Sequence, residues 1–89
     1  MDGAEEDQYE QMAQQVMALE KIAKPMMSKE SISRYGNLKT AHPETAIKAI
    51  AIVAQAVQMG QLRQVLSDNE FREILIEIQK GKKTYKFKA

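Results

Sequence analysis

Cysteine is missing from this 89-residue chain, which excludes disulfide bonds, thiolate metal sites and a cysteine nucleophile. Histidine occurs once, as His42, with no second histidine or cysteine near it in the sequence. Because metal sites need several clustered ligands, we expect a capping or surface role for His42, no metal and no cofactor. The phosphate-binding signatures G-x-x-x-x-G-K and G-x-G-x-x-G are also missing.

Long apolar runs are missing too. The longest, Ala49 to Ala54, is far shorter than the ~20 residues that a membrane-spanning helix needs. The first residues are acidic, unlike the basic start of a secretory signal peptide. We therefore expect a cytoplasmic protein that has access to the nucleoid and has no membrane partner.

Catalytic patterns are weak. Glu70, Glu73 and Glu77 follow one side of a predicted helix, but acid–base catalysis needs a carboxylate with a shifted pKa in a desolvated cleft. We expect Glu70 to cap that helix and the other two to be solvated. The serines of the segment 28–33 have no base partner in the pattern. The sequence therefore predicts a protein that is not an enzyme.

Apolar residues recur at spacings of three and four over Glu5 to Lys24, which predicts a first helix that Pro25 ends. A second, short helix is predicted over Ser28 to Tyr35. Gly36 follows it at the place of a left-handed C-terminal cap, and Asn37 to His42 is predicted to be a connection.

The third and fourth helices have clearer signals at their ends. Pro43 is predicted to open the third, Gly60 to follow its end, and its length is apolar nearly all round, which predicts the central helix. Ser67 and Glu70 form a capping box at the start of the fourth helix, and Gly81 is predicted to end it.

Charge is concentrated at the two ends, although the net charge is only +1. The first ten residues carry five acids and no base, and the last eleven carry five lysines and no acid. Tyr85 and Phe87 alternate with the last lysines, a period typical of an extended segment. Clustered lysines attract phosphates whatever the base sequence, so this basic tail indicates a polyanion as partner.

These patterns predict an all-α protein with a compact three-helix bundle core, an additional N-terminal helix and a basic extended C-terminal tail. We divide the chain into an acidic segment and helical arm over residues 1–25, the helical bundle core over 26–81 and the basic tail over 82–89.

The order of features from Met26 to Lys88 resembles the programmed cell death protein 5 family. The matching features are a short helix with Arg34, a Pro-Glu helix start at His42-Pro43-Glu44, the stretch Ala54 to Leu62, and a last helix that opens at Ser67 to Phe71. The resemblance implies a three-helix core with an N-terminal helix and, in archaeal members, DNA binding. In eukaryotic members it also implies interaction with chaperonin and chromatin-acetylation machinery. An acidic C-terminal tail, found in eukaryotic members, is missing, so the chain resembles the archaeal form.

We therefore predict a monomer that binds double-stranded DNA non-specifically through backbone electrostatics. The candidate binding residues are Lys80, Lys82, Lys83, Tyr85, Lys86, Phe87 and Lys88, with Arg34, Lys39 and Lys29 as further cations. Sequence-specific reading is not expected, because the chain has only three arginines, and arginine–guanine pairs are the commonest specific contacts.

The alternative is a helical protein–protein interaction adaptor with a chaperone- or chromatin-associated partner. Methionines cluster in the first third of the chain, at Met12, Met17, Met26 and Met27. Such side chains can accommodate varied partners, but we favour a role in filling the groove where the first helix packs. Salt separates the two functions, because DNA binding weakens steeply with salt and apolar burial does not.

Overall fold

The computed structural model describes the backbone of residues 3–81 and the side chains of residues 12–81. Its elements are α1 (Gly3–Ala23), the short 3-10 helix η1 (Lys24–Met26), α2 (Lys29–Ala41), α3 (Pro43–Gln58) and α4 (Asp68–Gln79). Within this range there is no strand, only an isolated parallel bridge between Met27 and Leu66. The predicted all-helical class is confirmed for this part of the chain. No helix in it is long and apolar enough to cross a membrane.

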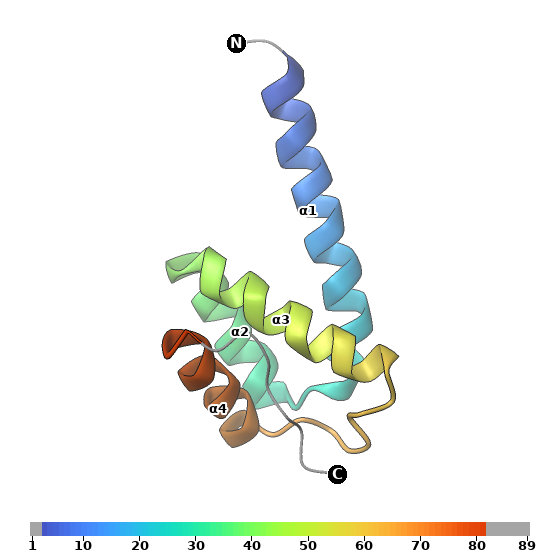
Figure 1. The fold of residues 1–89 in the computed structure, drawn as a ribbon, viewed down its shortest axis with the longest axis vertical. Coiled ribbons are helices and arrows are strands. Elements are labelled where there is room, and N and C mark those ends of the chain that lie inside the picture. Colours follow the sequence, from blue (N-terminus) through green and yellow to red (C-terminus); the bar gives the residue numbers. More distant parts are fainter. Residues whose placement is uncertain (1–2, 82–89) are drawn as a thin grey trace.

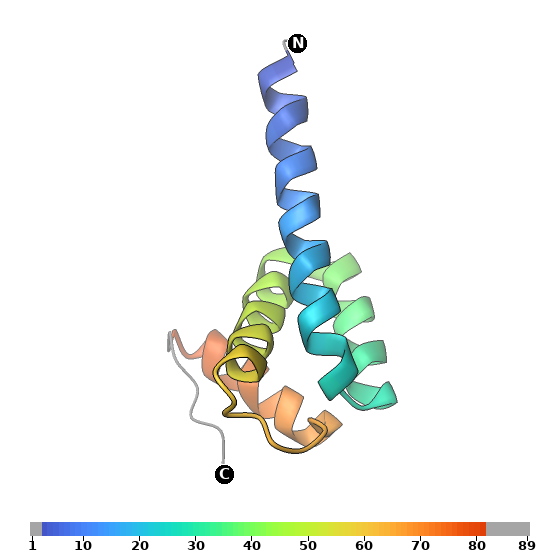
Figure 2. The same cartoon turned by 90° about the vertical axis from the view of Figure 1, so that its right-hand side faces the viewer.

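The first helix, α1, has two halves with different surroundings. Its C-terminal half packs on α3, with Val16 and Ala23 buried and Leu19 half-buried. Its N-terminal half projects beyond the other helices (Figures 1 and 2). Met12 and Met17 are therefore exposed, so the prediction that they fill a packing groove is wrong for these two. Met27 does fill the core, at 5% exposure.

The second helix is longer than predicted. Ser28 caps it as expected, and its Oγ accepts a hydrogen bond from the Ser31 amide at 3.1 Å. The predicted end at Gly36 and the predicted connection from Asn37 to His42 are wrong, because α2 continues to Ala41. Gly36 does not have a positive φ. Tyr35 is buried and Leu38 packs against the core, so tertiary contacts hold the helix together on both sides of the glycine.

The third helix is central, as predicted. Pro43 occupies its first turn, and Gly60 follows its end with a φ of +71°, a conformation that favours glycine. Helices α1, α2 and α4 all pack against α3. Six of its residues are buried: Ala46, Ala49, Ile50, Val53, Ala54 and Ala56.

The fourth helix begins with the predicted capping box. The Glu70 amide donates to Ser67 Oγ, the Ser67 amide donates to Glu70 Oε1, both at 3.1 Å, and Gly81 follows the helix at a φ of +83°. Just before it, Leu66 joins the start of α2, because the Ser28 amide donates to the Leu66 carbonyl at 2.9 Å. Phe71 and Ile74 then bury the inner face of α4. One apolar core thus takes residues from all four helices, including Ala23 of α1.

Candidate nucleic-acid interface

The predicted basic tail lies outside the described residues, except for its first lysine. Lys80 is exposed and caps the C-terminal end of α4. Its Nζ lies 4.0 Å from Glu77 Oε1, a long contact between solvated groups. The predicted residues Lys82, Lys83, Tyr85, Lys86, Phe87 and Lys88 belong to the part of the chain that the structure does not describe.

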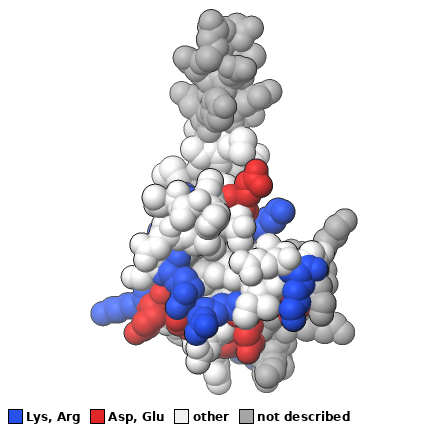
Figure 3. Space-filling view, turned by 90° about the vertical axis from the view of Figure 1, so that its left-hand side faces the viewer, with Lys and Arg blue, Asp and Glu red and all other residues white. Residues whose placement is uncertain are grey.

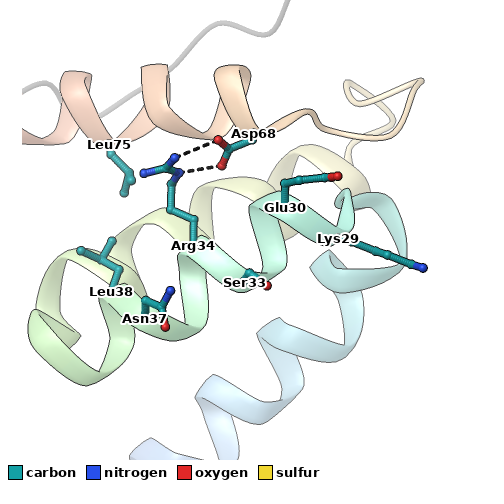
Figure 4. Close-up of a pocket in the computed structure, with 8 residues that line it drawn as sticks. All are labelled: Lys29, Glu30, Ser33, Arg34, Asn37, Leu38, Asp68 and Leu75. Atoms are coloured by element: carbon teal, nitrogen blue, oxygen red, sulfur yellow. Dashed lines mark hydrogen bonds and ion pairs between the residues drawn. The ribbon is translucent and has the colours of Figure 1, made fainter.

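Arg34 is already paired with a carboxylate. Its Nε donates to Asp68 Oδ1 at 2.6 Å and its Nη2 donates to Asp68 Oδ2 at 2.9 Å, which joins α2 to α4 (Figure 4). The hydrogen bond from Arg34 lowers the pKa of Asp68, so both groups stay charged at neutral pH. A phosphate that approached Arg34 would have to compete with this carboxylate.

The groove around Arg34 has balanced charge. It lies between α2 and α4, with Leu38 and Leu75 as apolar lining (Figure 4). Its two cations, Arg34 and Lys29, share it with two carboxylates, Glu30 and Asp68. The Lys29 side chain extends away from Arg34, so the two predicted binding residues do not converge on one point (Figure 4).

Lys39 lies elsewhere, where side chains bridge α1 and α2. Glu20 Oε2 accepts hydrogen bonds from Lys39 Nζ at 2.8 Å and from the buried Tyr35 hydroxyl at 2.6 Å. Partial burial alone would raise the pKa of Glu20, but the bonds from Lys39 and Tyr35 and the charges of Lys39 and Lys24 outweigh it and lower the pKa. Burial and the bond to Glu20 raise the pKa of Tyr35, so its hydroxyl remains a donor.

Two further lysines, not predicted as binding residues, lie beside this junction. Lys24 Nζ lies 6.0 Å from the centroid of the Tyr35 ring. Lys21 and Lys24 line a surface hollow together with Glu20, Met17 and Pro25. We call Lys21, Lys24 and Lys39 the lysine seam. Their sequence signal was the spacing of three between Lys21 and Lys24, which places two cations on one face of a helix end.

Elsewhere on the described surface, positive and negative side chains alternate. Figure 3 shows one face of the bundle on which Lys and Arg atoms lie close to Asp and Glu atoms. His42 is exposed between α2 and α3 and makes no side-chain capping bond. Within residues 12–81, no group of three or more His, Asp or Glu side chains is placed to hold a metal ion.

Comparison with known proteins gives a consistent result. The family model described as "Double-stranded DNA-binding domain" matches residues 1–89. A Thermococcus sibiricus protein named "DNA-binding protein" is 31% identical over 75 residues, which cover 84% of this chain and 67% of that protein. The Thermococcus kodakarensis "DNA-binding protein TK1278" is 33% identical over 60 residues, covering 67% of this chain and 54% of that protein. A Thermococcus onnurineus "DNA-binding protein" is 28% identical over 75 residues, 84% of this chain and 67% of that protein. The chain thus spans between about half and two thirds of these relatives, and no solved structure matches it.

Proposed function

Because this chain belongs to the double-stranded DNA-binding domain family, we propose that it binds duplex DNA through the phosphate backbone, without preference for base sequence. The observation that carries the proposal is the family match over residues 1–89. We assign the main contact to the basic tail, whose five lysines are Lys80, Lys82, Lys83, Lys86 and Lys88. Tyr85 and Phe87 orient the tail or stack on bases.

The distribution of arginine supports backbone binding over base reading. Only three arginines are present, and Arg34 already directs two of its nitrogens at Asp68. The long helix α3 lies against three other helices and buries six residues, so it cannot enter a major groove as a recognition helix.

The finer identity follows from the resemblance to the programmed cell death protein 5 family. We propose that the chain is an archaeal-type member of that family, monomeric, cytoplasmic and without enzymatic activity. Curated relatives from three Thermococcus species that are named DNA-binding proteins support the archaeal assignment.

Fluorescence anisotropy of a labelled duplex, titrated with the full chain at several salt concentrations, tests this function. If the tail engages three to five phosphates, the logarithm of the binding constant should fall against log salt with a slope of about −3 to −4.5. Changing all five tail lysines to glutamine should remove most of this slope. Changing the same five to arginine is the matched control, because it keeps the charge and should keep the slope.

Two outcomes would overturn the proposal. If the unchanged chain does not bind duplex DNA even at low salt, DNA is not its partner. If two duplexes of unrelated sequence differ in affinity by much more than ten-fold, the chain reads bases, since each wrong base pair at a specific site costs about 1–3 kcal/mol.

A helical protein-interaction adaptor is the second candidate, and the surface of α1 favours it. Met12 and Met17 are 56% and 54% exposed, and flexible methionine side chains suit partners of varied shape. A protein partner held by apolar burial should keep its affinity as salt rises, and changing Met12 and Met17 to glutamine should weaken it. The same double change should leave DNA affinity unaltered, which separates the two functions.

A further inference from the structure

We infer that the lysine seam of Lys21, Lys24 and Lys39 is a second DNA-backbone contact, located on the folded bundle and separate from the basic tail. This inference rests on the proposed function, because it assigns to the same ligand a second set of residues. It also differs from the sequence-based choice of Arg34 and Lys29 as the cations that extend the tail.

The balance of charge distinguishes the seam from the α2–α4 groove. In the groove, two cations face two carboxylates. In the seam, three ammonium groups surround one carboxylate, Glu20, and all three lysines are exposed. The seam therefore presents a local excess of positive charge, which a phosphate backbone needs.

The seam is also held in place by its neighbours. Glu20 fixes the Lys39 ammonium at 2.8 Å, and the Tyr35 hydroxyl holds the same carboxylate oxygen from a buried position. Pro25 ends α1 and puts Lys24 into the 3-10 turn, where its ammonium lies over the Tyr35 ring. Charges positioned before binding lose less conformational entropy when a ligand arrives.

The paired lysine can still bind. An ammonium has three N–H donors, and Lys39 directs one at Glu20, so the others remain directed at solvent. Lys21 and Lys24 form no ion pair with any carboxylate in the described part of the chain. Lysines act on phosphates as point charges, so the seam should add affinity without adding base preference.

The test uses the full chain and two double variants of equal charge. Lys21→Gln with Lys24→Gln removes two seam cations and leaves the Lys39–Glu20 pair intact. Lys48→Gln with Arg63→Gln removes two exposed cations from α3 and from the loop before α4. Binding of a labelled mixed-sequence duplex is measured by anisotropy across salt concentrations, and circular dichroism melting confirms that each variant folds.

If the seam contacts DNA, the seam variant should lose about 1.8 units of salt slope, or 0.9 for each phosphate released, and about ten-fold or more in affinity at 0.1 M salt. The control variant should keep nearly all of its slope. Adding Lys39→Gln to the seam variant should remove up to about 0.9 more.

The inference is overturned if the unchanged chain binds DNA and the seam and control variants keep equal slopes. The proposed function then stands, with the tail as its binding element. If the unchanged chain shows no salt-dependent binding at all, the proposed function fails, and the seam assignment fails with it.

Discussion

At the scale of single residues, Glu20 joins two helices through one oxygen atom. Its Oε2 accepts from Tyr35 of α2 and from Lys39 of α2, while Glu20 itself belongs to α1. Its side chain is only 14% exposed, so its charge depends on these two donors to offset lost hydration. The charged carboxylate therefore contributes to stability, and protonation weakens that contribution.

The pH dependence of the Glu20→Gln variant checks this role. The folded-state pKa of Glu20 is lowered, so its contribution is present above its ordinary pKa and is lost as the pH falls through the lowered one. At pH 7 we expect the variant to lose about 1–2 kcal/mol, since bonds to charged groups contribute roughly 1.5–3 kcal/mol and solvent screens the exposed Lys39. At pH 3 the difference from the unchanged chain should shrink. Urea unfolding at both pH values measures it, and an equal difference at both would contradict the ionic role.

At the scale of the elements, local signals predicted where helices begin better than where they end. Ser28 and Ser67 cap the starts of α2 and α4, and Pro43 opens α3, because capping bonds and the ring of proline are local chemistry. A glycine has no such local rule. Gly60 lies beyond a helix and Gly36 lies inside one, and only the tertiary contacts around Gly36 decide between these outcomes.

The substitution Gly36→Ala tests the interior position of this glycine. A Cβ atom at Gly36 would meet nothing within 4 Å, and its φ is not positive. Because alanine costs less backbone entropy than glycine in a helix, we expect a gain of about 0.5–1 kcal/mol in the free energy of unfolding. Gly60→Ala is the opposed control. At a φ of +71° it should lose about 1 kcal/mol or more, although space is open there too. Thermal or urea unfolding measures both, and a loss at Gly36 would contradict a helical interior position.

At the scale of the whole molecule, the sequence reveals a binding residue when its neighbours along the chain carry the signal. The basic tail is such a case, because its lysines are consecutive or nearly so. Arg34 and Lys39 were predicted as available cations, but they pair with Asp68 and Glu20, which are 34 and 19 residues away. The lysine seam has the same origin. It exists only once α1 ends at Pro25 and α2 places Lys39 beside Glu20, so no local pattern could predict it.

The central place of α3 is the other whole-molecule property, and it determines how the chain should unfold. Helices α1, α2 and α4 each pack on α3, so a cavity in its buried face weakens every helix contact at once. Ile50, on α3, is fully buried, while Ile76 on α4 is 45% exposed, which makes Ile50→Ala and Ile76→Ala a pair with identical chemistry.

We expect Ile50→Ala to lose about 2–5 kcal/mol, the range for deleting a buried isoleucine side chain, and Ile76→Ala to lose under about 1 kcal/mol. A small domain has roughly 5–15 kcal/mol of stability, so the first change removes a large share of it. Urea unfolding followed by far-ultraviolet circular dichroism and by tyrosine fluorescence should give coincident transitions, because Tyr35 lies in the core that α3 organises. If the two variants lose similar amounts, or the two signals separate in the Ile50→Ala chain, then α3 does not couple the other helices into one cooperative unit.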